Sequence, residues 1–158
     1  YGMHFIEESG GSPRNCIIHG HGTDGGKVGV FFESGSEHIT MINSELVAMS
    51  TTNKVAIKLG SEFNATTVLI GSLIWGNPDY LAVVDGGVLK IQNLHATRHG
   101  NGILANGGKI EARNLNFLSG KGAHVQERGG KVLLESVVTQ GALRIDGNQS
   151  TALSVERY

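Results

Sequence analysis

The sequence predicts an all-β protein: a single-stranded, right-handed parallel β-helix of about six coils, with three short strands per coil. Three observations lead to this prediction. One pattern recurs six times, apolar and polar residues alternate with a period of two in short runs, and 24 of the 158 residues are glycine against 2 prolines. Such alternation indicates strands with one buried face, and three strands in roughly 22 residues are typical of stacked coils. The right-handed sense follows from the general preference of parallel crossovers.

The repeat is clearest in the second half of the chain. Three segments, 88–96, 109–117 and 131–139, align almost without gaps, and each follows a Gly-Gly pair. Two looser copies precede them, beginning at His38 and Thr67. Glycine supplies the tight bends between strands.

One position of the repeat carries a small polar residue or glycine, at spacings of 28, 28, 22, 21 and 22 residues. Its six members are Asn15, Asn43, Gly71, Asn93, Asn114 and Ser136. Asparagine tolerates a left-handed backbone at a sharp turn. Stacked at the strand spacing of about 4.8 Å, successive asparagines are expected to hydrogen-bond as a ladder.

Alternation after this turn predicts two inward-facing columns of side chains. The first consists of Cys16, Ser44, Ser72, Leu94, Leu115 and Val137. The second consists of Ile18, Leu46, Ile74, Ala96, Phe117 and Thr139. Cys16, the single cysteine, is therefore interpreted as a small core residue and not as a nucleophile.

Other repeat folds fit less well. Leucine-rich repeats need a regular Leu-x-x-Leu-x-Leu signature, propeller blades need about 40 residues per unit, and a sandwich would not return one residue type at a fixed phase. We expect residues 1–158 to form one domain, with coils over 15–147. Residues 1–14 would form an N-terminal cap or partial coil and 148–158 a C-terminal cap or tail. About six coils are few for this architecture, so we expect a fragment of a larger protein.

Composition excludes several classes of function. The formal net charge is −1 and no run of lysine or arginine occurs, so we expect no nucleic-acid partner. No apolar run reaches the roughly 18 residues of a membrane-spanning helix, so we expect no membrane partner. No cofactor is expected.

The asparagine turns and segments such as 35–43 resemble the pectate-lyase-like right-handed β-helix superfamily, over about residues 15–147. This superfamily includes polysaccharide lyases and hydrolases and bacteriophage tailspikes. The resemblance implies a polysaccharide partner and an extracellular or virion-associated location. Fold alone does not establish function, and whether the chain is an enzyme stays open.

Catalytic motifs of the better-known members are missing. Gly20-His21-Gly22 matches one polygalacturonase-like motif, but no Asn-Thr-Asp or Asp-Asp precedes it and no Arg-Ile-Lys follows it. Calcium-dependent lyases need an acidic cluster with a basic residue, and no convincing version is present. Glycoside hydrolysis needs two carboxylates about 5 Å apart, or 6.5–9.5 Å for inversion. Outward carboxylates that neighbouring coils could pair are Asp24, Glu33, Glu45, Asp79 and Asp85; the enzyme hypothesis uses Asp24, Glu33, Asp79 and Asp85.

Sugar binding needs an aromatic surface beside hydrogen-bonding groups. The richest stretch is the predicted loop 75–80, which holds the only tryptophan, and the next coil supplies basic neighbours. The predicted ligand-binding residues are Trp75, Asn77, Asp79, Tyr80, His95, Arg98 and His99. The simpler interpretation is a β-turn whose tryptophan packs on the outside of the coil.

A second polar cluster contains His19, His21 and Asp24, where a His-x-His pair shares one side of an extended strand. These residues are a candidate metal site. We favour the alternative of a solvated loop between strands, because metal sites usually draw further ligands from elsewhere.

Three hypotheses result. The leading one is a polysaccharide-contacting β-helix domain with weak catalysis or none. The second is a polysaccharide hydrolase or lyase that uses paired carboxylates. The third is a structural, homotrimeric tailspike or fibre segment, with outward residues such as Ile17, Leu73 and Val138 at its interface.

Overall fold

The fold is that of a computed structural model, which describes residues 2–6, 17–19, 27–35, 38–48, 55–147 and 155–157. For residues 17–19, 48 and 155–157 the description covers the backbone alone. Across these ranges the protein consists of strands and connecting turns, with no helix that could span a bilayer. The all-β prediction is confirmed.

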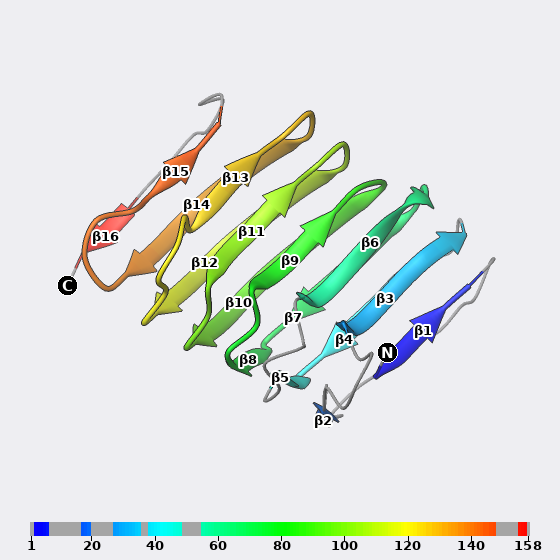
Figure 1. The fold of residues 1–158 in the computed structure, drawn as a ribbon, viewed down its shortest axis with the longest axis horizontal. Helices are drawn as coiled ribbons and strands as arrows, with labels where there is room; N and C mark the ends of the chain where they lie inside the picture. Colours follow the sequence, from blue (N-terminus) through cyan, green and yellow to red (C-terminus); the bar gives the residue numbers. More distant parts are fainter. Residues whose placement is uncertain are drawn as a thin grey trace.

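The strands form two parallel sheets (Figure 1). The first sheet contains, in spatial order, β1 (Met3–Phe5), β3 (Val28–Gly35), β6 (Val55–Phe63), β9 (Tyr80–Val84), β11 (Asn101–Ala105), β13 (Val125–Glu127) and β15 (Ile145–Asp146). The second contains β2 (Ile17–His19), β5 (Glu45–Ala48), β8 (Leu73–Gly76), β10 (Val88–Thr97), β12 (Lys109–Leu118), β14 (Lys131–Thr139) and β16 (Val155–Arg157). Beside this path, β4 (Ile39–Ile42) pairs with β7 (Thr66–Ile70), and β7 pairs with β10.

From β3 to β15 the chain alternates between the two sheets, so each strand pairs with its equivalent one repeat away. In the second sheet, for example, His95 lies in register with Leu73 on one side and Asn116 on the other. Figure 1 shows the strands stacked in chain order, with β1 and β15 at opposite ends of the first sheet. The two segments expected to act as caps each contribute one strand, β1 and β16.

The predicted turn residues adopt the left-handed conformation at every described position. The φ angles are 50° at Asn43, 59° at Gly71, 56° at Asn93, 54° at Asn114 and 58° at Ser136. The predicted ladder is present where Asn114 Nδ2 donates to Asn93 Oδ1 at 3.0 Å. Asn15 lies outside the described residues.

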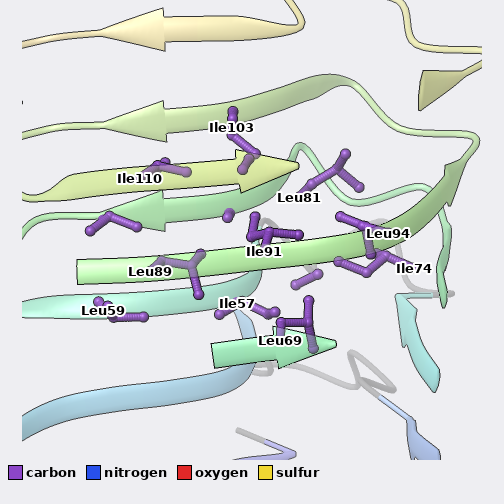
Figure 2. Close-up of a cluster of buried hydrophobic side chains, with 14 of the residues drawn as sticks. Ile57, Leu59, Leu69, Ile74, Leu81, Leu89, Ile91, Leu94, Ile103 and Ile110 are labelled. Atoms are coloured by element: carbon purple, nitrogen blue, oxygen red, sulfur yellow. The ribbon is translucent and has the colours of Figure 1, made fainter. Parts of the chain in front are cut away.

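Both predicted inward columns are buried wherever side chains are described. The residues concerned are Ser44, Ser72, Leu94, Leu115, Val137, Leu46, Ile74, Ala96, Phe117 and Thr139. Figure 2 shows the core around β10, where Leu89, Ile91 and Leu94 lie among side chains of neighbouring repeats. Burial of each large aliphatic side chain contributes about 1.5–3 kcal/mol. Cys16 lies outside the described residues, and Ile18 is described by its backbone only.

The recurring glycine pairs have a steric cause. A Cβ atom on Gly86 would lie 2.7 Å from the main-chain oxygen of Gly60, and one on Gly108 would lie 2.8 Å from that of Gly86. A Cβ on Gly130 would clash with Gly108 in the same way. Successive repeats approach so closely at this corner that only glycine fits.

Candidate functional site

Among the described turn residues of the second sheet, Gly71 is the one without a side chain. Asn43, Gly71 and Asn93 occupy equivalent turns, linked by main-chain hydrogen bonds of 2.9 Å from Asn43 to Ile70 and from Gly71 to Gln92. Gly71 has no side-chain amide to continue the ladder. The Asn43 Oδ1 atom lies 2.7 Å from the position that a Cβ atom of Gly71 would take. The ladder is therefore broken between Asn43 and Asn93.

A groove of about 500 Å³ lies at this break. Its lining residues are Asn43, Ser44, Glu45, Gly71, Ser72, Leu73, Asn93 and His95. Glu45, Leu73 and His95 form one row in register across β5, β8 and β10. Glu45 and His95 thus lie two strand spacings apart, about 10 Å between their backbones.

The buried serines behind the groove are hydrogen-bonded within the protein. The main-chain N–H of Ser44 donates to Ser72 Oγ at 3.2 Å. The Ser72 hydroxyl donates to the carbonyl of Ile70 at 3.1 Å, and the Ser44 hydroxyl lies 3.4 Å from that of Ile42. The floor of the groove is polar, but its two serine hydroxyl groups already form hydrogen bonds within the protein. We therefore expect the surrounding side chains to contact a ligand.

Trp75 flanks the groove. The sequence predicted a loop at this residue, but Trp75 belongs to β8, because the alternation of Leu73 and Ile74 continues through it. Its indole N–H donates to the Glu45 carboxylate, and its neighbour in register, Val47, is buried. The half-buried indole is therefore held against the acidic end of the groove.

His95 stands at the other end of the row. It is exposed, and the Asn116 amide nitrogen lies 3.2 Å from His95 Nδ1. Since an amide N–H can only donate, Nδ1 accepts in this contact, and Nε2 is the ring nitrogen that carries a proton. His95 therefore keeps its Nε2–H as a hydrogen-bond donor on the side of the ring away from Asn116.

The remaining predicted ligand residues lie elsewhere. Asn77 and Asp79 are exposed on the connection to the first sheet, and Tyr80 begins β9 of that sheet. Arg98 is exposed in a left-handed turn with φ 52°. None of these four side chains lines the groove.

His99, the seventh predicted ligand residue, is only 2% exposed and lies in the interior. Its ring packs edge-on against Phe117 and His124, which is 1% exposed. Among the described residues, neither ring nitrogen of His99 has a partner with good hydrogen-bond geometry, although the main chain of Asn101 lies close enough to influence its pKa. By contrast, His124 Nδ1 accepts from the main-chain N–H of Arg144 at 3.1 Å. The repeat pattern does not predict this buried pair.

Burial lowers the pKa of both histidines. For His124 the pKa falls to about 4, through burial first and then through the neighbouring Arg144 guanidinium and His99. For His99 burial is again the main cause of a lowered pKa. The Arg144 guanidinium is held in place by the carbonyls of Gly122 and Gly120, at 2.7 and 2.8 Å. Both rings are therefore neutral at pH 7.

The candidate catalytic carboxylates are dispersed. On the first sheet, Glu33 lies within β3 at a shift of register and Asp85 directly follows β9, with β6 between the two strands. Glu33 contacts His4 Nε2 at 2.7 Å. Asp85 pairs with Lys58 at 3.2 Å and accepts from Asn106 at 2.9 Å. Each carboxylate already has a partner.

Asp146, near the C-terminal end of the first sheet, pairs in register with Gln126, which donates to it at 3.1 Å. The predicted metal site cannot be described. Asp24 and His21 lie outside the described residues, and His19 is described by its backbone only. Among the side chains that are described, no three histidine, cysteine, aspartate or glutamate residues gather as metal ligands.

No family model, curated protein or solved structure matches the chain.

Proposed function

We propose that this chain is a polysaccharide-contacting domain of an extracellular or virion-associated protein, and that the groove at Gly71 is its sugar-facing element. Trp75, Glu45 and His95 are the side chains we assign to it. The observation that carries the proposal is the convergence of polar side chains in one groove beside an indole.

The architecture that we propose is the right-handed parallel β-helix of about six coils. In its support, each described pair of strands is parallel, and equivalent strands pair at intervals of one repeat. In such a stack an outward row runs across several coils. A linear polymer can follow such a row, which is why this geometry favours a chain-like ligand over a compact one.

The chemistry of the groove favours a carbohydrate. Sugars present hydroxyl groups that donate and accept, beside apolar C–H faces. The amides of Asn43 and Asn93 and the Glu45 carboxylate supply hydrogen-bonding groups, while Leu73 supplies an apolar strip between them. The indole of Trp75 at the margin offers a face for a sugar ring.

A glycan array followed by calorimetric titration of the best ligand tests this proposal. We expect Trp75→Ala to weaken binding at least about tenfold, or 1.4 kcal/mol. Tyr80→Ala is the matched control, since it removes an aromatic ring on the other sheet. Equal affinity of Trp75→Ala and the unmodified protein for every bound glycan would refute the assignment.

One observation favours a second candidate, a polysaccharide hydrolase. Glu33 in β3 and Asp85 after β9 lie on the two strands that flank β6, and two strand spacings amount to about 10 Å between backbones. Inverting glycosidases separate their carboxyl groups by 6.5–9.5 Å. Release of reducing ends that disappears in both Glu33→Gln and Asp85→Asn would favour this candidate.

A further inference from the structure

The groove contains one formally charged group, the Glu45 carboxylate. Its other lining residues are asparagine, serine, glycine, leucine and histidine. In the described part of the chain Glu45 forms no ion pair. Its one recorded hydrogen bond comes from the neutral indole N–H of Trp75. Among the described side chains, the acidic end of the groove therefore has no basic partner.

We propose that this charge makes the groove selective for amino sugars that carry a free ammonium group, and that it rejects uronic acids. The inference rests on the function proposed above and specifies its ligand class. A carboxylate beside an aromatic ring can bind an ammonium group through two interactions. The carboxylate accepts a charge-assisted hydrogen bond, and the face of the ring attracts the cation.

The hydrogen bond to Trp75 sets the geometry of this recognition. The indole engages Glu45 Oε1, which leaves Oε2 to accept from a ligand. At the break in the ladder, Asn43 Oδ1 is an acceptor beside Gly71, and Asn93 has its oxygen engaged by Asn114, so that its amide N–H donates. One sugar hydroxyl can accept from Asn93 and another can donate to Asn43, while the ammonium group meets Glu45.

Uronic acids and N-acetylated sugars cannot form all of these interactions. A uronic acid would bring its carboxylate toward that of Glu45, and like charges repel. An N-acetylated sugar keeps the hydroxyl contacts but carries no positive charge. The groove should therefore rank glucosamine oligomers first, N-acetylglucosamine oligomers second and galacturonic acid oligomers last.

The single tryptophan makes the groove directly observable. Trp75 fluorescence would be titrated with hexasaccharides of glucosamine, N-acetylglucosamine and galacturonic acid, at low salt and about pH 7, where an amine retains positive charge. We expect glucosamine hexasaccharide to bind at least tenfold more tightly than the N-acetylated form, with added salt reducing the difference.

Glu45→Gln is the decisive variant, because its amide oxygen can still accept from the indole. We expect it to abolish the preference for glucosamine over N-acetylglucosamine. Asp79→Asn, an exposed acid outside the groove, should retain the preference. Equal or tighter binding of the N-acetylated or galacturonic acid oligomer, or a preference that survives in Glu45→Gln, would overturn the inference while leaving polysaccharide binding intact. Failure of all three oligomers to bind would overturn the proposed function with it.

Discussion

Two corners of this protein have the same backbone and different surfaces. At Asn114 the left-handed turn carries an amide that donates to Asn93, and the column of side chains is continuous. At Gly71 the turn has almost the same φ angle, yet Gly71 has no side chain that could continue the column from Asn43 to Asn93. The backbone conformation determines where the turn lies. The presence or absence of a side chain at the turn residue determines whether the column of side chains continues or a groove opens.

The residues behind the two corners differ as well. The inward position after the turn is serine at Ser44 and Ser72, next to the groove, but leucine at Leu94 and Leu115 in the following repeats. A buried leucine contributes about 1.5–3 kcal/mol. A serine hydroxyl that is satisfied internally contributes less, typically about 1 kcal/mol. The repeats beside the groove therefore bury less apolar side-chain surface at this position than the following repeats, and they gain less stability from it.

The largest expected effect contrasts a leucine from each region. We expect Leu115→Ala to lower the free energy of unfolding by 2–5 kcal/mol, because the side chain is 1% exposed and its removal leaves a cavity. Leu73→Ala, which shortens a half-buried outward side chain, should cost less than about 1 kcal/mol. Urea unfolding monitored by circular dichroism measures both. Similar losses for the two variants would mean that Leu73 belongs to the core.

A smaller effect concerns pH and the buried histidines of the later repeats. An unfolded histidine binds its proton near pH 6.5, whereas His124 in the folded protein does so only near pH 4. The unfolded state binds more protons between these values, so stability is full above pH 6.5 and falls as the pH drops. We expect a loss of about 2 kcal/mol between pH 7 and pH 5 from His124 alone.

The lowered pKa of His99 acts in the same direction as that of His124. Urea unfolding at the two pH values measures the effect, and His124→Gln should reduce it. Glu111, whose pKa is lowered mainly by a hydrogen bond from Lys109, loses its contribution only below about its usual pKa of 4.5. Stability that is unchanged between pH 7 and pH 5 would contradict burial of neutral histidines.

Much of this fold could be predicted because its causes are local and recur. The left-handed turns fall on the predicted residues Asn43, Gly71, Asn93, Asn114 and Ser136. Burial of the alternating residues follows from the period of a strand, and the glycine pairs mark a corner where backbones nearly touch.

The contacts that were not predicted depend on register between distant residues. Trp75 and Glu45 are separated by 30 residues and meet because β5 pairs with β8. His99 and His124 meet although 25 residues separate them, whereas the neighbouring turn residues recur at 21 and 22. The two histidines thus occupy different positions of their repeats, and a repeat alignment does not bring them together. The repeat pattern therefore predicts a surface position for His99, whereas the structure places this side chain in the interior.

The most direct measurement of the central claim fills the groove by restoring the ladder residue. Gly71→Asn suits the left-handed turn, since asparagine tolerates that conformation, and the Asn43 amide it approaches can rotate away. We expect a free energy of unfolding within about 1 kcal/mol of the unmodified protein and, by calorimetry, at least a tenfold loss of oligosaccharide affinity. Gly141→Asn, at a left-handed glycine with open space around it, is the control that should keep full affinity. A stable Gly71→Asn variant that binds oligosaccharide as tightly as the unmodified protein would show that the break in the ladder is not the binding site.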